Sequence, residues 1–482
     1  MSFARLVGIP LASMVAGLGL PAAAQAQQVP LAGLIGKIIQ ESTFNSATPN
    51  AAGVIVNHQG HFLVGEALQL SARQMNVELG AQLLSFPLGS SSGGFSFTTD
   101  SMTGETSMSS ETFGPAFAER AITLGKGQTN IGYAFQSTSY DSFEGVPLDS
   151  GRLSFIRQHN DCCPATANNP TQPTNFTPEF ERDLLQSNLS LDINSRASVL
   201  FATYGVTDRF DLGVAVPFVH VDIDARVDGR ILRTASGANS PTHSFDTAGS
   251  DHATFTESGS SNGLGDLSIR AKYNFLRGDV TALAAGLDLR LPTGDKDELL
   301  GTGATRAEMT FIYSGDYGRV SPHVNVGYTL SSGTSSSSAS DLEVDPVEHR
   351  LDTIGTLALA DVDLEVPDEF NYVFGLNVAA HPRVTVGFDV RGRTLFDVSR
   401  FELRDNVYPN RAAGPVPTAA FTASQEFSLL DETGKVNMVL GIVGAKINVA
   451  KTLLLNANVL FPMTDGGLKP KPTLVFGIDY VF

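Results

Sequence analysis

The chain has 482 residues, of which 42% are hydrophobic, and its formal net charge is −18. An acidic excess of this size argues against a nucleic-acid partner. After residue 30 no stretch approaches the roughly 20 apolar residues of a membrane-spanning helix, so only a β-barrel could place this chain in a membrane.

The first 26 residues predict export. Arg5 is the only charge before an apolar run at 6–20, and the small residues at 22–26 are typical of a signal-peptide cleavage site. We therefore expect residues 1–26 to be a signal peptide. The alternative, a transmembrane anchor, would need a longer apolar run.

Residues 27–127 lack the alternation of a barrel and are expected to form a plug or a periplasmic segment. Leu31, Leu34, Ile35, Ile38 and Ile39 recur at helical spacing. The stretch 67–83 fits either a second amphipathic helix or one strand of a hairpin with 95–99. The stretch 101–115, rich in Ser, Thr and Gly, predicts a loop.

The only two cysteines are the neighbours Cys162 and Cys163, so the fold is not a disulfide framework. We expect them to lie in a loop and to have no catalytic role. Export would permit an oxidised pair.

From residue 128 to the end, apolar and polar residues alternate, as in strands that face lipid on one side and a wet lumen on the other. Twelve such strands are joined by short turns on one side and long polar loops on the other, which places both termini in the periplasm. The pattern predicts an all-β fold: a transmembrane antiparallel up-and-down β-barrel of about 12 strands, or 14 if the N-terminal hairpin joins it. A partly helical N-terminal segment precedes this barrel, which spans 128–482.

The strand expected at 183–205 is longer than one bilayer crossing. Its apolar residues keep the odd positions from Leu185 to Phe201, which predicts a strand that projects beyond the membrane.

The next strand changes its pattern beside Pro217, where apolar residues move from even to odd positions. A β-bulge would produce such a change, because one extra residue exchanges the two faces. We then expect His220, Asp222 and Asp224 to point inward.

Charged residues at inward positions form a candidate lumen lining. Opposite charges on neighbouring strands can pair, which would only stabilise the wall, whereas unpaired basic residues would border a constriction that favours anionic or polarisable aromatic solutes. The sequence leaves both alternatives open. The candidates are Arg270, Lys272, Asp288, Arg290, Asp389, Arg391 and Arg393.

The last strand, 472–482, has its bulkiest apolar residues at even positions and ends on an aromatic residue. Tyr480 and Phe482 at this spacing resemble the C-terminal assembly signal of bacterial outer-membrane barrels. The resemblance implies that barrel assembly machinery recognises this strand.

A family resemblance lies in two short segments, YGVTDRFDLGVAVPF at 204–218 and LPTGDKDELLGTG at 291–303. Both are similar to segments of the outer-membrane proteins grouped as transporters of the phenol meta-degradation pathway, which are distantly like the long-chain fatty-acid transporters. The resemblance implies the passage of small hydrophobic or aromatic molecules.

Catalytic and metal-binding patterns are weak. His243 precedes Ser244, but adjacent residues of an extended chain point apart and do not form a dyad. His323 shares an inward strand face with Asn325. The acidic residues at 341–345 and 361–369 could collect divalent cations or belong to solvated loops, and they match no defined calcium loop. We expect no enzyme activity, no cofactor and no metal site.

These patterns predict an outer-membrane channel or transporter for small, hydrophobic or aromatic molecules. The alternative is a structural or adhesive surface barrel without transport. The expected partners are outer-membrane lipid, the barrel assembly machinery and a small hydrophobic or aromatic solute, with no nucleic acid.

Overall fold

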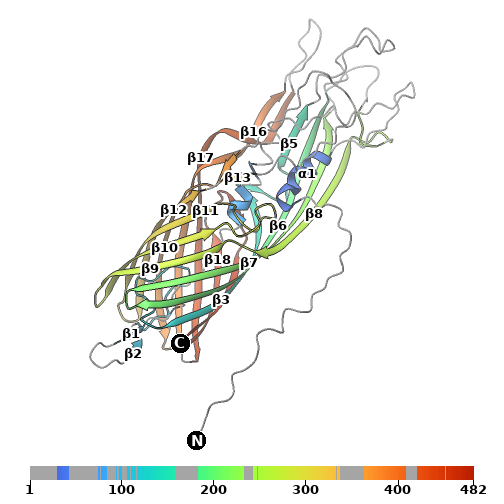
Figure 1. Ribbon diagram of the computed structural model, residues 1–482. Helices are drawn as coiled ribbons and strands as arrows, with labels where there is room; N and C mark the ends of the chain where they lie inside the picture. The colour runs from blue at the N-terminus through green and yellow to red at the C-terminus, as the bar shows by residue number, and fades with distance from the viewer. Residues whose placement is uncertain are drawn as a thin grey trace, which may run out of the picture.

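The computed structural model of the chain is shown in Figure 1. It describes residues 30–42, 74–75, 78–83, 94, 97–99, 106–108, 110–115, 117–158, 183–232, 243–246, 248–332, 334–336, 363–408, 421–450 and 452–482. The expected signal peptide 1–26 and the cysteines Cys162 and Cys163 lie outside these residues.

Twelve strands of the described chain close into an antiparallel barrel. Closure occurs at β3, which pairs with β20 on one side and with β6 on the other. The twelve strands are β3 (Thr129–Phe143), β6 (Leu184–Thr207), β7 (Phe210–Leu232), β9 (Leu267–Arg277), β10 (Thr281–Leu291), β11 (Thr305–Gly315), β12 (Val320–Ser332), β15 (Glu369–His381), β16 (Val384–Tyr408), β17 (Phe421–Ala450), β18 (Leu453–Pro462) and β20 (Thr473–Val481). The predicted fold class is confirmed.

The hairpin considered between 67–83 and 95–99 is not formed by the described residues, and the hairpin that is present does not join the barrel. β1 (Phe97–Thr99) and β2 (Thr106–Met108) pair only with each other among the described strands, so the barrel has 12 strands and not 14. β2 also lies within the stretch 101–115, where a loop was expected. A helix is present at 78–83, where helix and strand were both considered.

Short turns and long connections lie at opposite ends of the barrel. The turns between β6 and β7 and between β15 and β16 are at the same end as Phe482, and Figure 1 shows the C-terminus there. Several strands extend past the other end as an extramembrane sheet. It consists of the distal parts of β6, β7, β16 and β17 together with β5 (Leu153–Gln158) and β8 (His252–Leu264).

Three small pairings complete the described strands. β4 (Val146–Pro147) and β19 (Leu468–Pro470) both pair with the end of β3. β13 (Thr334–Ser336) pairs with β14 (Asp363–Glu365).

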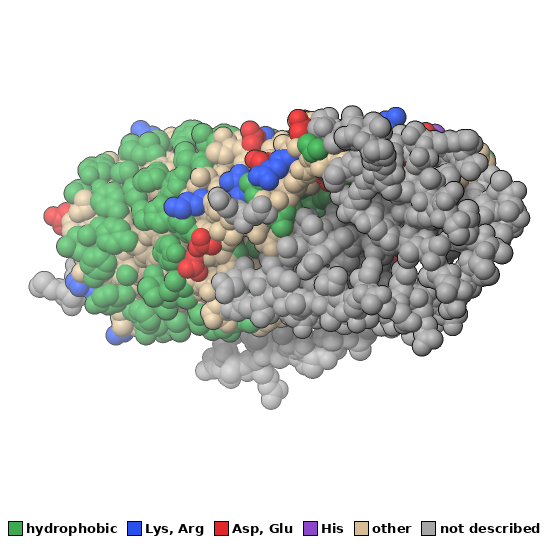
Figure 2. Space-filling view, turned by 90° about the horizontal axis from the view of Figure 1, so that it is seen from above, with side chains coloured by type: hydrophobic (Ala, Val, Ile, Leu, Met, Phe, Trp, Pro, Cys, Tyr) green, Lys and Arg blue, Asp and Glu red, His purple; other side chains and the backbone are tan. Residues whose placement is uncertain are grey.

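The outer wall of the barrel is apolar. Every one of the twelve strands exposes a large hydrophobic side chain on its outward face, which is what a lipid-facing wall requires. These include Ile131, Leu200, Leu212, Ile269, Leu287, Phe311, Tyr328, Phe374, Phe388, Val443, Leu455 and Phe476. In Figure 2 hydrophobic side chains cover one end of the visible face, and charged side chains gather beyond them.

Beyond this apolar band, β6 and β7 reverse the sides of their polar and apolar residues. Leu189 and Ile193 on β6, and Val221 and Ile223 on β7, are buried inside, while Asp224 is exposed outside. The odd apolar positions of this part of β6 therefore face a core and not lipid. The distal part of β6 lies in the extramembrane sheet, which agrees with the prediction that this strand projects beyond the membrane.

The expected bulge at Pro217 and the inward direction of His220, Asp222 and Asp224 are wrong. The register between β6 and β7 runs unbroken from Leu184↔Leu232 to Gly205↔Asp211. The pattern changes because the surroundings change: the outside of the strand passes from lipid to water, and the inside passes from a polar lumen to an apolar core.

The N-terminal helix completes that core. η1 (Leu31–Gly33) leads into α1 (Leu34–Glu41), whose apolar residues pack with Val221, Ile223 and Phe427. Lys37 of α1 forms an ion pair with Glu257 of β8, and Arg157 of β5 donates to the carbonyl of Ser42. No helix in the described ranges has both the length and the apolar character to span a membrane.

Candidate lumen site

A stretch of the N-terminal segment crosses the barrel near the end with the short turns. Asn325 of β12 binds both polar groups of the Glu119 backbone. The N–H of Glu119 donates to Asn325 Oδ1 (2.6 Å), and Asn325 Nδ2 donates to the carbonyl of Glu119 (3.0 Å). The N–H of Ala121 donates to Ser314 Oγ at 2.9 Å, and Lys446 Nζ donates to the carbonyl of Pro115 at 2.8 Å. The stretch 110–127 is therefore fixed to β11, β12 and β17.

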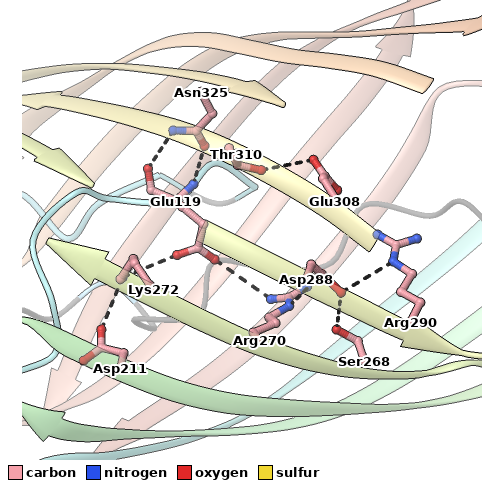
Figure 3. A network of polar contacts seen from close by, with 10 residues as sticks. All are labelled: Glu119, Asp211, Ser268, Arg270, Lys272, Asp288, Arg290, Glu308, Thr310 and Asn325. Atoms are coloured by element: carbon pink, nitrogen blue, oxygen red, sulfur yellow. Dashed lines mark hydrogen bonds and ion pairs between the residues drawn. The ribbon is translucent and has the colours of Figure 1, made fainter. Parts of the chain in front are cut away.

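A chain of ion pairs lies next to this stretch (Figure 3). The carboxylate of Glu119 lies 3.5 Å from Lys272 Nζ and 4.0 Å from Arg270 Nη1. Lys272 also contacts Asp211 (3.4 Å), and Arg270 Nε donates to Asp288 Oδ2 at 3.1 Å. The structure thus turns Arg270, Lys272 and Asp288 inward, as the alternation of β9 and β10 predicts.

Arg290 continues this chain, with its Nε 3.8 Å from Asp288 Oδ1. A second charged group lies nearby around Glu369, which pairs with Arg306 and lies 3.6 Å from Arg393 Nη1. Glu369 is 5% exposed. Glu369 is therefore a lumen residue. The sequence pattern suggested instead that it belongs to an acidic outer loop.

Arg391 differs from its neighbours because its guanidinium has no hydrogen-bond or ion-pair partner among the described residues. It lines a cavity of about 100 Å³ in the middle of the barrel. Glu119, Arg270, Asp288, Arg290, Glu308 and Arg391 line this cavity, together with the apolar side chains of Phe117 and Ile312. It combines a charged wall with an apolar one.

Asp389 does not share this environment. It is 5% exposed and contacts His323 Nε2 at 2.8 Å, while Asn377 lies 3.3 Å from the other ring nitrogen. Gly375 makes room for this pair, since a Cβ there would lie 1.9 Å from Asp389 Oδ1. Asp389 points inward as predicted but is part of the wall rather than the cavity lining.

The histidine neighbours considered from the sequence have separate partners. Asn325 holds Glu119 and not His323. His243 contacts Asp183 at 2.9 Å, while Ser244 Oγ donates to the carbonyl of Asp246. Within the described ranges no group of three or more His, Cys, Asp or Glu side chains is arranged to hold a metal ion.

Three residues that line the cavities were not predicted from the sequence: Glu119, Arg306 and Glu308. Arg306 and Glu308 alternate with Ala307 and Met309, so the parity that identified Asp288 and Arg290 could have found them. Glu119 gave no such signal, because its position depends on the path of an irregular segment.

Tyr480 and Phe482 lie on the outward face of the closing strand. They are 48% and 57% exposed, and their rings stack with centroids 5.6 Å apart. The backbone of Phe482 exchanges two hydrogen bonds with Thr129, at 2.8 and 2.9 Å. Their role as an assembly signal stays a prediction.

The closed antiparallel fold and the apolar outer wall are those of a β-barrel of the outer-membrane type. The model of the family described as "Putative MetA-pathway of phenol degradation" matches residues 181–392, which confirms the predicted resemblance over that stretch. No sequence among curated proteins matches the chain.

Solved structures resemble the chain at low identity. The COG4313 outer membrane channel from Pseudomonas putida F1 is 13% identical with a TM-score of 0.40, covering 75% of this chain and 98% of that one. The P. putida toluene transporter TodX is 10% identical (TM-score 0.28, 74% of this chain and 89% of that one). A Pseudomonas aeruginosa FadL homologue is 11% identical (TM-score 0.28, 74% and 89%).

Proposed function

We propose that this protein is an outer-membrane channel or transporter for small hydrophobic or aromatic molecules, exported by a signal peptide at residues 1–26. The observation that carries the proposal is the cavity between Phe117 and Arg391, which lies inside a barrel with a lipid-facing wall. A barrel of twelve strands is wide enough for a narrow passage unless something fills it.

In this proposal residues 27–127 are the plug. On the extramembrane side α1 packs in an apolar core, and a hydrophobic solute that enters there would have to displace α1 while keeping an apolar environment. On the other side the stretch 110–127 crosses the barrel below the cavity. A solute would therefore pass from the apolar core to the central cavity, which has charged and apolar walls, and leave only when the stretch 110–127 moves.

The second candidate is a structural or adhesive barrel. The observation that favours it is the filling of the interior, since Phe113, Leu124, Leu454 and Val481 pack together where a passage would leave the barrel.

Loosening the plug tests the two candidates. Asn325→Ala removes both hydrogen bonds to the backbone of Glu119, so we expect a larger single-channel conductance in planar bilayers than the wild type gives. Asp224→Asn, on the outer surface of the extramembrane sheet, is the matched control. Uptake of labelled benzyl alcohol by porin-deficient cells, with and without the protein, measures transport itself. Equal uptake in both and no conductance change in Asn325→Ala would favour the structural barrel.

A further inference from the structure

We propose that the central cavity binds one small organic anion, with its carboxylate on Arg391 and its apolar body against Phe117 and Ile312. The inference rests on the proposed function and names the class of solute that the cavity selects. The chemical class is an aromatic or similarly compact monocarboxylate.

The balance of charge in the lumen is the first observation. The central cavity and the smaller one beside it are lined by six basic side chains, Arg270, Lys272, Arg290, Arg306, Arg391 and Arg393, and by five acidic ones, Glu119, Asp211, Asp288, Glu308 and Glu369. The linings of these two cavities together therefore carry one positive charge in excess, although the whole chain carries −18. A net positive charge on the lining of a narrow cavity favours the binding of an anion.

The pairing of these charges is the second observation. Glu119, Asp211 and Asp288 are engaged by Arg270, Lys272 and Arg290, and Glu369 is engaged by Arg306 and Arg393. Among the basic residues of both cavities, Arg391 alone has no ion-pair partner within 4.0 Å in the described part of the chain. Its guanidinium offers five N–H donors, and a carboxylate can accept two of them in parallel.

Glu308 does not cancel this charge at close range. Its Oε1 accepts from Thr310 at 3.4 Å, and within the described ranges no basic side chain lies close enough to form an ion pair with it. Its negative charge acts on Arg391 through space and is shared with Arg290, which lines the same two cavities. Glu308 therefore weakens the anion site without occupying it, and it disfavours a second carboxylate on the solute.

The apolar wall gives the solute its second property. Phe117 lines the cavity from the stretch 110–127 and is 8% exposed, while Ile312 of β11 lines it as a fully buried side chain. A phenyl ring in the cavity would contact the exposed part of Phe117, which an inorganic anion would leave in contact with water. The cavity volume of about 100 Å³ suits a body of one ring.

Equilibrium dialysis of the purified full-length protein in detergent tests the site, with benzoate, benzyl alcohol and benzylamine as probes. The three have the same ring and differ in charge. We expect the wild-type protein to bind benzoate best of the three. Arg391→Gln should weaken benzoate binding at least about tenfold, because it removes the charge-assisted hydrogen bonds to the carboxylate. Arg391→Lys should retain part of the affinity, because a lysine keeps the positive charge but not the paired donors. Glu308→Gln should strengthen benzoate binding.

The matched control is Arg226→Gln, which removes an exposed arginine on the outer face of the extramembrane sheet and should leave benzoate binding unchanged. Heat-modifiable migration confirms that each variant is folded. Wild-type affinity in Arg391→Gln, or tighter binding of benzylamine than of benzoate, would overturn the proposal. Uptake by cells separates the anion site from the proposed channel function. If benzyl alcohol enters through the protein but benzoate does not bind, the anion site is wrong and the channel stands. If benzoate binds and neither probe is taken up, the site stands and the channel is wrong.

Discussion

At the scale of single residues, Glu78 has the clearest consequence for behaviour with pH. It is 4% exposed and lies beyond the lipid-facing band, near Glu144 and the backbone of Ser399. Burial, and then the negative charge of Glu144, raise the pKa of Glu78 from its ordinary value of 4.5 to about 8. The folded protein therefore holds this proton more tightly than the unfolded chain does.

The sign of the effect follows from this raised pKa. Stability contributed by protonated Glu78 is fully present below about pH 4.5 and is lost as the pH rises to about 8, by up to a few kcal/mol. We expect hydrogen-exchange protection factors for residues 78–83 to fall by up to about a hundredfold between pH 5.5 and 8.5. In Glu78→Gln, which cannot ionise, they should stay constant. A wild-type profile as flat as that of the variant would contradict the shifted pKa.

At the scale of elements, we expect the closing strand β20 to be required for assembly of the barrel. Its backbone pairs with β3 and β18, so the barrel cannot close without it. Deleting residues 478–482 should strongly reduce the heat-modifiable barrel in the outer membrane. Phe482→Ser should reduce it partly and Phe482→Tyr hardly at all, if the aromatic ring is recognised. Equal assembly of Phe482→Ser and the wild type would show that pairing alone matters.

The hairpin of β9 and β10 shows why much of the barrel could be predicted from sequence. Its charges Arg270, Lys272, Asp288 and Arg290 all fall on even positions, and a charged side chain in lipid costs so much that their face must be the inner one. In the distal halves of β6 and β7 the same period of two was visible, but it identifies which residues share a face, not which face is inside. That assignment depends on the medium outside the strand. The position of Glu119 depends on tertiary contacts of an irregular segment, for which periodicity carries no information.

At the scale of the whole molecule, β6 and β7 run through two regions of opposite polarity, the barrel and the extramembrane sheet. Nearer the short turns the wall is apolar outside and charged inside; in the extramembrane sheet it is polar outside and apolar inside. α1 packs in the second region and the stretch 110–127 in the first. The boundary between them on β7 lies between Phe218, which is 49% exposed, and the outward contact of His220 Nε2 with Asp222 Oδ2.

Three substitutions on β7 test this boundary within one strand. Val214→Arg places a charge on the lipid face and should cost about 2 to 4 kcal/mol if the site is near the midplane. Asp224→Arg, ten residues along on the same outward face, should cost less than about 0.5 kcal/mol because it meets water. Ile223→Arg turns a charge into the apolar core and should destabilise the extramembrane sheet. Urea unfolding in lipid vesicles measures all three. Equal costs for Val214→Arg and Asp224→Arg would mean that lipid reaches Asp224, and the reversal of polarity along β6 and β7 would need another cause.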